Sequence, residues 1–204
     1  MIYENSCNNI KIVSGSTFCS KNLKIIDLSS NQLTSLESNY FRRAVNIIII
    51  KLNLNKIKRI QPIAFKELTN LVSVDLSENL ISSIDNLTFK GLSNLEYLDL
   101  THNLINEIDE YTFDDLSSLK EICLGSNNII SIKNKTFKGP SNLEAIFLSN
   151  NHLTTLNWNI FENLNELRLL DLTENYLLSK HQSEVVENLI DTINILFESQ
   201  KNLK

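Results

Sequence analysis

The sequence predicts an α/β solenoid, a stack of similar turns in which each turn adds one short strand to a parallel sheet. Three observations support this fold class: apolar residues recur every 24 positions, an asparagine recurs at the same interval, and an amphipathic segment follows the last repeat. A fixed period of roughly 20 to 50 residues is the signature of repeat architectures. We therefore expect the 204 residues to form one elongated domain.

Three apolar columns define the strand of each repeat. The repeats start at Leu23, Ile47, Leu71, Leu95, Leu119, Leu143 and Leu167. A second apolar residue follows three positions later and a leucine five positions later, without exception. The alternation at these positions has a period of two, so these side chains point inward from a short strand and their neighbours point outward. Successive strands are expected to stack as a parallel sheet.

An asparagine column lies where each strand ends. Its members are Asn31, Asn55, Asn79, Asn103, Asn127, Asn151 and Asn175. A buried amide at this point can bond backbone groups of its own turn and of the adjacent turn, as buried polar groups must. We therefore expect a structural ladder and not a row of catalytic residues.

The second half of six repeats carries another apolar residue and then a phenylalanine. The phenylalanines are Phe41, Phe65, Phe89, Phe113, Phe137 and Phe161. A buried aromatic ring contributes a large apolar area. This column therefore predicts a spine of stacked rings on the side away from the strands.

The pattern L-x-x-L-x-L-x-x-N-x-L across residues 23–178 resembles the leucine-rich-repeat family. The resemblance implies seven repeats in a horseshoe, with a short parallel sheet on the concave face and an irregular or 3-10 convex side. A 24-residue unit with this phenylalanine resembles the extracellular animal type seen in Toll-like receptors, Slit-like guidance proteins and matrix proteoglycans. It implies a protein-binding module of the receptor or adhesion kind.

The two ends depart from the repeat. In residues 179–204, apolar residues between Ser183 and Gln200 recur at helical spacing, which predicts an amphipathic helix that caps the stack. A membrane-surface helix is the alternative, but the polar face lacks the Lys and Arg of such helices. Residues 1–22 are interpreted as a degenerate repeat or a cap, with Cys7 and Ile12 standing 24 positions before Asn31 and Leu36.

The composition of the chain indicates which classes of partner to expect. The net charge is -5, which gives no basic footprint for nucleic acid or an anionic membrane, so we expect a neutral or basic protein ligand and no nucleic-acid partner. No apolar run is long enough to span a bilayer, which predicts no direct membrane insertion. The cysteines Cys7, Cys19 and Cys123 have no metal-ligand spacing, so no metal or cofactor is expected. Neither the oligomeric state nor the ligand follows from the sequence.

The compartment is predicted from several features. The sequons Asn86-Leu87-Thr88 and Asn134-Lys135-Thr136 lie at the same phase of the repeat, on the loop side, and predict glycosylation of Asn86 and Asn134. Cys7 and Cys19 could pair in an oxidising compartment, although the four-cysteine caps of extracellular members are absent. No secretory signal is evident at residues 1–7. We expect an extracellular or cell-surface location, with a cytoplasmic one as the alternative.

The outward positions of the strands are the candidate binding residues, because a rigid scaffold presents them on a broad surface. They are Lys51, Asp75, Tyr97, Asp99, His102, Glu121, Cys123, Phe147 and Asn150. Tyr97 and Phe147 are the candidate anchors, since aromatic residues are enriched among interface hot spots. The aspartates also fit a frequent Leu-Asp-Leu-Ser variant of the repeat, for which a solvated stripe is the alternative interpretation.

The sequence leaves three function classes to consider. The first is a receptor or adhesion module that binds a protein on its concave face, and the second is an intracellular scaffold or adaptor. The third is an enzyme with a Cys/His or Glu/His site built from Cys123, His102 and Glu78. An open sheet offers no closed cleft that would shift pKa values and no evident oxyanion hole. We therefore predict that the protein is not an enzyme.

Overall fold

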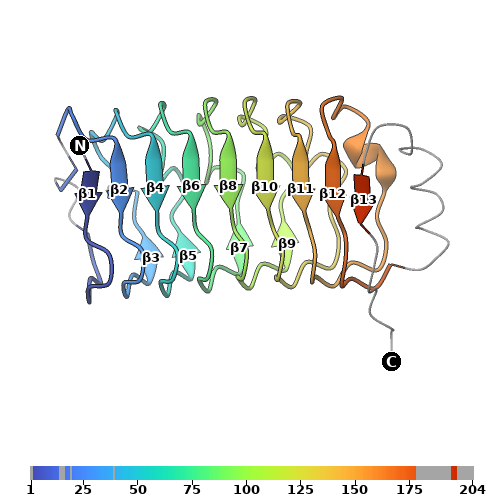
Figure 1. Cartoon of the computed structure of the whole chain (residues 1–204), viewed down its shortest axis with the longest axis horizontal. Coiled ribbons are helices and arrows are strands. Elements are labelled where there is room, and N and C mark those ends of the chain that lie inside the picture. Colours follow the sequence, from blue (N-terminus) through green and yellow to red (C-terminus); the bar gives the residue numbers. More distant parts are fainter. Residues whose placement is uncertain (1, 14–16, 19, 39, 178–193, 197–204) are drawn as a thin grey trace.

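The computed structural model describes residues 2–13, 17–18, 20–38, 40–177 and 194–196. They form an elongated stack of turns with a nine-stranded parallel sheet along one side, in the order β1-β2-β4-β6-β8-β10-β11-β12-β13 (Figure 1). The bounds are β1 Ile2–Glu4, β2 Ile25–Asp27, β4 Ile49–Lys51, β6 Ser73–Asp75, β8 Tyr97–Asp99, β10 Glu121–Cys123, β11 Ala145–Phe147, β12 Leu169–Asp171 and β13 Asn194–Leu196. The predicted solenoid is confirmed.

In the nine-stranded sheet, each strand from β2 to β12 buries its central residue and leaves the two flanking residues partly or largely exposed. Leu98 in β8 and Ile122 in β10 are fully buried, whereas Tyr97 and Asp99 are half-buried. From β2 to β12 every strand pairs with the residue 24 positions away, as in Tyr97 with Glu121. The constant repeat length therefore sets the register of the sheet.

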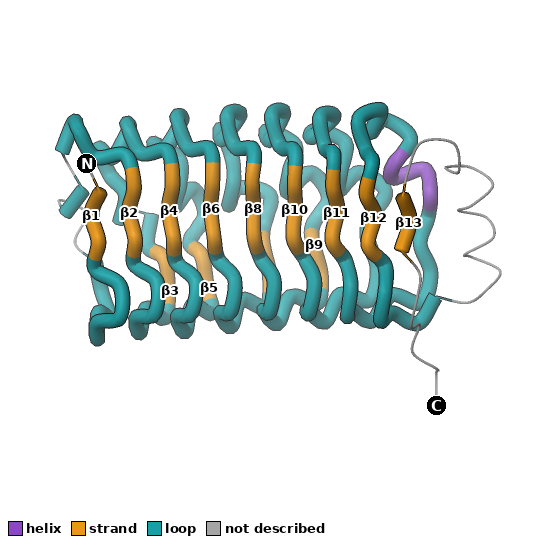
Figure 2. The backbone as a smooth tube through the Cα atoms, in the orientation of Figure 1, coloured by secondary structure: helices purple, strands orange, loops and turns teal. Residues whose placement is uncertain are grey.

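The side opposite the sheet, here called the loop side, consists mainly of turns (Figure 2). Two small parallel pairs occur there, β3 (Ser35–Leu36) with β5 (Arg59–Ile60) and β7 (Ser83–Ile84) with β9 (Glu107–Ile108). A 3-10 helix, η1, covers Trp158–Phe161. The irregular and 3-10 character predicted for this side is confirmed.

The loop side also alternates between neighbouring repeats. β3 and β5 pair the first repeat with the second, and β7 and β9 pair the third with the fourth. The left-handed residues Ile63 (φ 58°) and Tyr111 (φ 63°) lie 48 positions apart, and Leu87 between them is not left-handed. Over these four repeats the loops therefore have a period of two repeats, although the strands have a period of one.

The asparagine column forms the predicted ladder. Asn103, for example, donates from Nδ2 to the carbonyls of Leu76 (3.0 Å) and Leu100 (3.1 Å), and its Oδ1 accepts the backbone N–H of Ile81 at 3.0 Å. All seven asparagines are at most 8% exposed. Each side chain thus joins its own turn to the preceding one and satisfies backbone groups that the strands leave open.

The phenylalanines form a continuous spine. Rings from Phe18 to Phe161 stack in sequence with centroid separations of 5.7 to 6.2 Å. The rings are buried, and stacked aromatic pairs add to the stabilisation that their buried area gives. This spine fills the core between the sheet and the loop side.

At the N-terminal end, a shorter turn of 23 residues joins the stack. Ile2 pairs with Ile25, and Ile10 donates its N–H to Asn31 Oδ1 as Leu33 does to Asn55. The predicted 24-residue alignment is wrong here by one position. Cys7 therefore takes the left-handed position of Ser30 and not the asparagine position. Likewise Ile12 is 77% exposed, and Val13 is the buried counterpart of Leu36.

At the C-terminal end, the predicted capping helix is wrong for Asn194–Leu196. These residues form β13, which pairs with β12 in parallel. A short apolar run fits a helix or a strand, and periodicity alone does not separate the two. Residues 178–193 and 197–204 lie outside the described part, as does the rest of the predicted helix. Within the described part, no helix has the length and apolar character needed to cross a bilayer.

Candidate functional site

The outward side of the nine-stranded sheet, here called the sheet face, corresponds to the predicted concave surface. The strands bring seven predicted residues onto it: Lys51, Asp75, Tyr97, Asp99, Glu121, Cys123 and Phe147. The pairing places Tyr97 beside Glu121, and Cys123 between Asp99 and Phe147. A period of two along each strand and of 24 between strands is sufficient to assemble this surface from the sequence.

Four of these residues make contact at the middle of the face, and we call them the central cluster: Tyr97, Asp99, Glu121 and Cys123. Tyr97 Oη donates to Asp99 Oδ2 at 3.1 Å. Cys123 Sγ lies 3.6 Å from Glu121 Oε1 and 4.0 Å from Tyr97 Oη. The cluster is therefore a polar network in which each titratable group has a neighbour.

Two groups of the cluster, Cys123 and Tyr97, have raised pKa values. Burial, together with the negative charges of Asp99 and Glu121, raises the pKa of the Cys123 thiol to about 12. Burial, with the neighbouring Cys123 and Asp99, also raises the pKa of Tyr97 well above its usual range. Because the thiolate is the nucleophilic form of cysteine, Cys123 is a poor nucleophile at neutral pH.

The aspartates of the sheet face also have a structural role. Asp75 Oδ1 accepts the backbone N–H of Ser77 at 3.0 Å and its hydroxyl at 2.7 Å. Asp99 accepts the N–H of Thr101 at 2.8 Å. The same arrangement occurs at Asp27 and at Asp171. The sequence signal is a Ser or Thr two positions after each Asp, and the solvated-stripe interpretation missed it.

Among the outward positions of the sheet-face strands β2, β4, β6, β8, β10, β11 and β12, Lys51 is the one basic residue. Its Nζ lies 3.6 Å from Asp27 Oδ2, on the neighbouring strand. Burial raises the pKa of Asp27, but hydrogen bonds from Ser29 and the charge of Lys51 outweigh it, and the pKa falls below its ordinary value. The remaining charges, Asp75, Asp99, Glu121 and Asp171, make the sheet face acidic.

His102 and Asn150 lie just beyond the strands and not within the central cluster. Both are exposed and have left-handed backbones, with φ of 55° and 53°. They belong to a column of left-handed residues: Ser30, Leu54, Glu78, His102, Ser126, Asn150 and Glu174. Asn150 Nδ2 donates to Ser126 Oγ at 3.1 Å. These residues form a rim along one edge of the sheet face.

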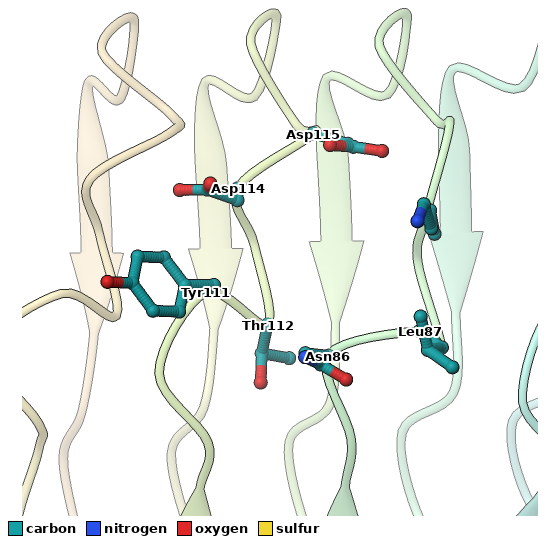
Figure 3. A pocket seen from close by; sticks show the side chains of 7 residues that line it. Asn86, Leu87, Tyr111, Thr112, Asp114 and Asp115 are labelled. Carbon is teal, nitrogen blue, oxygen red and sulfur yellow. The ribbon is translucent and has the colours of Figure 1, made fainter.

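The predicted glycosylation positions lie on the loop side. Asn86 and Asn134 are exposed, whereas Thr88 and Thr136 of the same sequons are buried. Figure 3 shows Asn86 beside Thr112 and Leu87, with the strands of the sheet behind them. Both asparagines are thus remote from the central cluster.

The described residues contain no group of three or more His, Cys, Asp or Glu side chains that could hold a metal ion. The sequence predicted the sheet face but not a hollow on the loop side, beside Leu87 and Lys90. Its only sequence signal is the pair of apolar residues Ile63 and Leu87 at equivalent positions of neighbouring repeats. Neither residue was assigned to a column of the repeat.

Comparisons with known proteins agree with this geometry. A family model described as leucine rich repeat matches residues 21–81, 69–129 and 117–177. No curated protein sequence matches the chain.

Two solved structures share the fold. The TLR13–ssRNA13 complex superposes with a TM-score of 0.81 and 31% identity over 89% of this chain. The glycosylated Toll–Spatzle complex from Drosophila gives a TM-score of 0.85 and 20% identity over 97% of this chain. The aligned region is 26% of the length of each of those chains.

Proposed function

The chain belongs to the leucine-rich-repeat family, and from this membership we propose that it is a receptor-type recognition module that binds a protein ligand on its sheet face. The observation that carries this proposal is the central cluster with Phe147 beside it. Tyr97, Cys123 and Phe147 are half-buried on three neighbouring strands of a rigid sheet. Aromatic side chains held in this way bury area on binding at low entropic cost.

The charge of the sheet face favours a protein with a neutral or basic surface. Asp75, Asp99, Glu121 and Asp171 face outward, and Lys51 is already close to Asp27. One similar structure contains ssRNA, so nucleic acid is the second candidate ligand. Binding to nucleic acid depends on basic side chains that neutralise phosphates, and the sheet face offers few of them. A protein ligand is therefore the stronger proposal.

We propose an extracellular or cell-surface location with glycans on Asn86 and Asn134, and take an intracellular scaffold as the alternative. Both asparagines are exposed on the loop side, where a glycan would leave the sheet face open. Secretion of the chain behind a signal peptide tests this: a mass shift removed by a glycosidase is expected. Thr136→Val is the matched control that removes one sequon, and a secreted chain with no glycan would contradict the proposal.

We further propose that the sheet face performs no catalysis. The raised pKa of Cys123 keeps its thiol protonated, and His102 lies on the rim outside the central cluster. The open sheet also provides no enclosed site where water is excluded around a reacting bond. These features support recognition in preference to reaction.

Capture of ligands tests the sheet-face proposal. The immobilised chain is compared with Tyr97→Ala/Phe147→Ala and with the control Leu104→Ala/Ile130→Ala, whose residues are exposed outside the strands. Proteins retained by the wild type and the control should be lost with the Tyr97/Phe147 variant, while its melting temperature stays close to that of the wild type. Equal retention by all three proteins would show that the sheet face is not the binding surface.

A further inference from the structure

A hollow of about 400 Å³ lies on the loop side, between the loops of the repeats that start at Ile47 and Leu71. Ile63 and Leu87 supply apolar lining, and each is 37% exposed. Figure 3 shows a neighbouring pocket, which shares Leu87, Lys90 and Asp115 with this hollow. Ligand pockets in proteins measure roughly 300 to 1,000 Å³, so the hollow is large enough to accept side chains of a partner.

The hollow lies at a junction between alternating loops. Arg43 and Gly91, 48 positions apart, are both left-handed, with φ of 66° and 84°. The N–H of each donates to a carboxylate of the next repeat, Glu67 and Asp115 respectively, at 2.7 Å. Neighbouring loops therefore follow different backbone paths, and the hollow lies between two unlike loops.

Two ammonium groups border the hollow. Lys66 and Lys90 occupy equivalent positions of adjacent repeats, and both line it. Neither forms an ion pair with any of the residues that the structure describes. The acidic lining residue, Asp115, already accepts the Gly91 N–H. The lining thus carries the two positive charges of Lys66 and Lys90 and the one negative charge of Asp115 beside an apolar floor.

From this combination we propose that the hollow is a second docking site, separate from the sheet face, for an extended acidic peptide segment of a partner protein. An aliphatic or aromatic side chain of the segment occupies the space over Ile63 and Leu87. Carboxylates on either side of that residue pair with Lys66 and Lys90. The apolar contact supplies affinity, and the two ion pairs supply the preference for an acidic segment.

Fluorescence anisotropy with defined peptides tests this proposal on the full chain produced in bacteria, where Asn86 carries no glycan. The probe is the labelled peptide Glu-Asp-Leu-Phe-Glu-Asp. The comparison peptides are Lys-Lys-Leu-Phe-Lys-Lys, which reverses the charge, and Glu-Asp-Ser-Ser-Glu-Asp, which removes the apolar anchor. We expect saturable binding of the probe and no binding of either comparison peptide. In the variant Lys66→Glu/Lys90→Glu, the affinity for the probe should fall roughly tenfold or more.

The matched control is Lys138→Glu, which reverses an exposed lysine of the same column outside the hollow. Its affinity for the probe should equal that of the wild type, and melting temperatures should confirm that all variants are folded. Equal affinity of the double variant, or equal binding of the basic peptide, would overturn the proposal. Binding of dodecanoate without binding of the probe would also overturn it, because the hollow would then take a lipid and not a peptide.

Discussion

Cys123 lies at the middle of the candidate site, yet its thiol is expected to be a poor nucleophile. Its thiol lies among Asp99, Glu121 and Tyr97, and its pKa is raised to about 12 by burial and by the two carboxylates. A group whose folded-state pKa is raised keeps its proton where the unfolded chain has lost it. Stability is therefore expected to fall as the pH rises above about 8.5, the ordinary pKa of cysteine.

Slow alkylation of Cys123 is the corresponding prediction. In the variant Cys7→Ser/Cys19→Ser, iodoacetamide at pH 8 should react with Cys123 at least ~100 times more slowly than with glutathione, because the thiolate fraction is so small. The measurement is the rate of mass increase. Unfolding in urea should restore a normal rate, and the variant that retains only the exposed Cys7 serves as the fast control. A comparable rate for folded Cys123 would contradict the raised pKa.

Asn103 makes the second prediction at the residue scale. Asn103→Ala leaves the N–H of Ile81 without its acceptor and removes the donor to Leu76 and Leu100, so a loss of about 1 to 3 kcal/mol of unfolding free energy is expected. Urea denaturation measures it. Asn128→Ala, at an exposed asparagine, should change stability by less than about 0.5 kcal/mol. Equal effects of the two changes would mean that the ladder is not a stabilising element.

The sequence predicts residues well where all repeats agree and less well where they differ. The asparagine ladder could be predicted because one amide occurs at one position in every turn. The hydrogen bond between Asp75 and Ser77 was missed. An outward carboxylate on an open sheet is expected to be solvated, and the sequence pattern does not show that the backbone after the strand turns back toward it. The contacts of the central cluster also depend on rotamers, which a period does not specify.

At the scale of elements, the turn that follows each strand of the nine-stranded sheet from β1 to β12 has a left-handed residue, and the chain places non-glycine residues there. Leu54 has φ of 56° and is 44% exposed, so it gains little from burial to offset the strain. A left-handed backbone costs a non-glycine residue roughly 1 to 2 kcal/mol. The repeat keeps this geometry because every turn has to match its neighbours.

Leu54→Gly is therefore expected to leave stability unchanged or to raise it by up to about 1 kcal/mol, since glycine adopts this backbone freely. Leu80→Gly is the matched control, because Leu80 is 36% exposed but has no left-handed backbone. It should lose roughly 0.5 to 1 kcal/mol through the flexibility of glycine in the unfolded chain. Thermal unfolding measures the stability of both variants. A larger loss of stability for Leu54→Gly than for Leu80→Gly would contradict the proposed backbone strain at Leu54.

The two ends show where prediction of elements fails. A single missing residue in the first turn moves Cys7 and Ile12 out of the expected columns. The sign of it in the sequence is Phe18, which lies 23 and not 24 positions before Phe41. At the other end, Asn194–Leu196 pair with β12, which a helix at the same place could not do. Pairing along an open edge is a tertiary effect, and it outweighs the local helical spacing.

At the scale of the whole molecule, the strands and the loops have different periods over the first four repeats. The strands repeat every 24 residues, while β3–β5 and β7–β9 recur every second turn. The uniform spacing of Leu, Asn and Phe in the sequence hides this alternation, which is why the hollow beside Lys66 and Lys90 could not be predicted. A solenoid with unlike neighbouring loops has two kinds of interface on its loop side.

Deletion of whole repeats tests this two-repeat period. Removing residues 71–118 brings Lys135 to the position of Leu87 beside Ile63, and it retains the β3–β5 pair. Removing residues 71–94 brings the left-handed Tyr111 beside the left-handed Ile63 and deprives β9 of its partner β7.

Stability in a solenoid is approximately a sum over repeats and nearest-neighbour interfaces, so the shorter deletion would ordinarily give the more stable protein. We expect the opposite order of melting temperatures, because the shorter deletion creates an interface between like loops. If the protein lacking one repeat melts at the higher temperature, the loops adapt freely and the alternation carries no energetic weight.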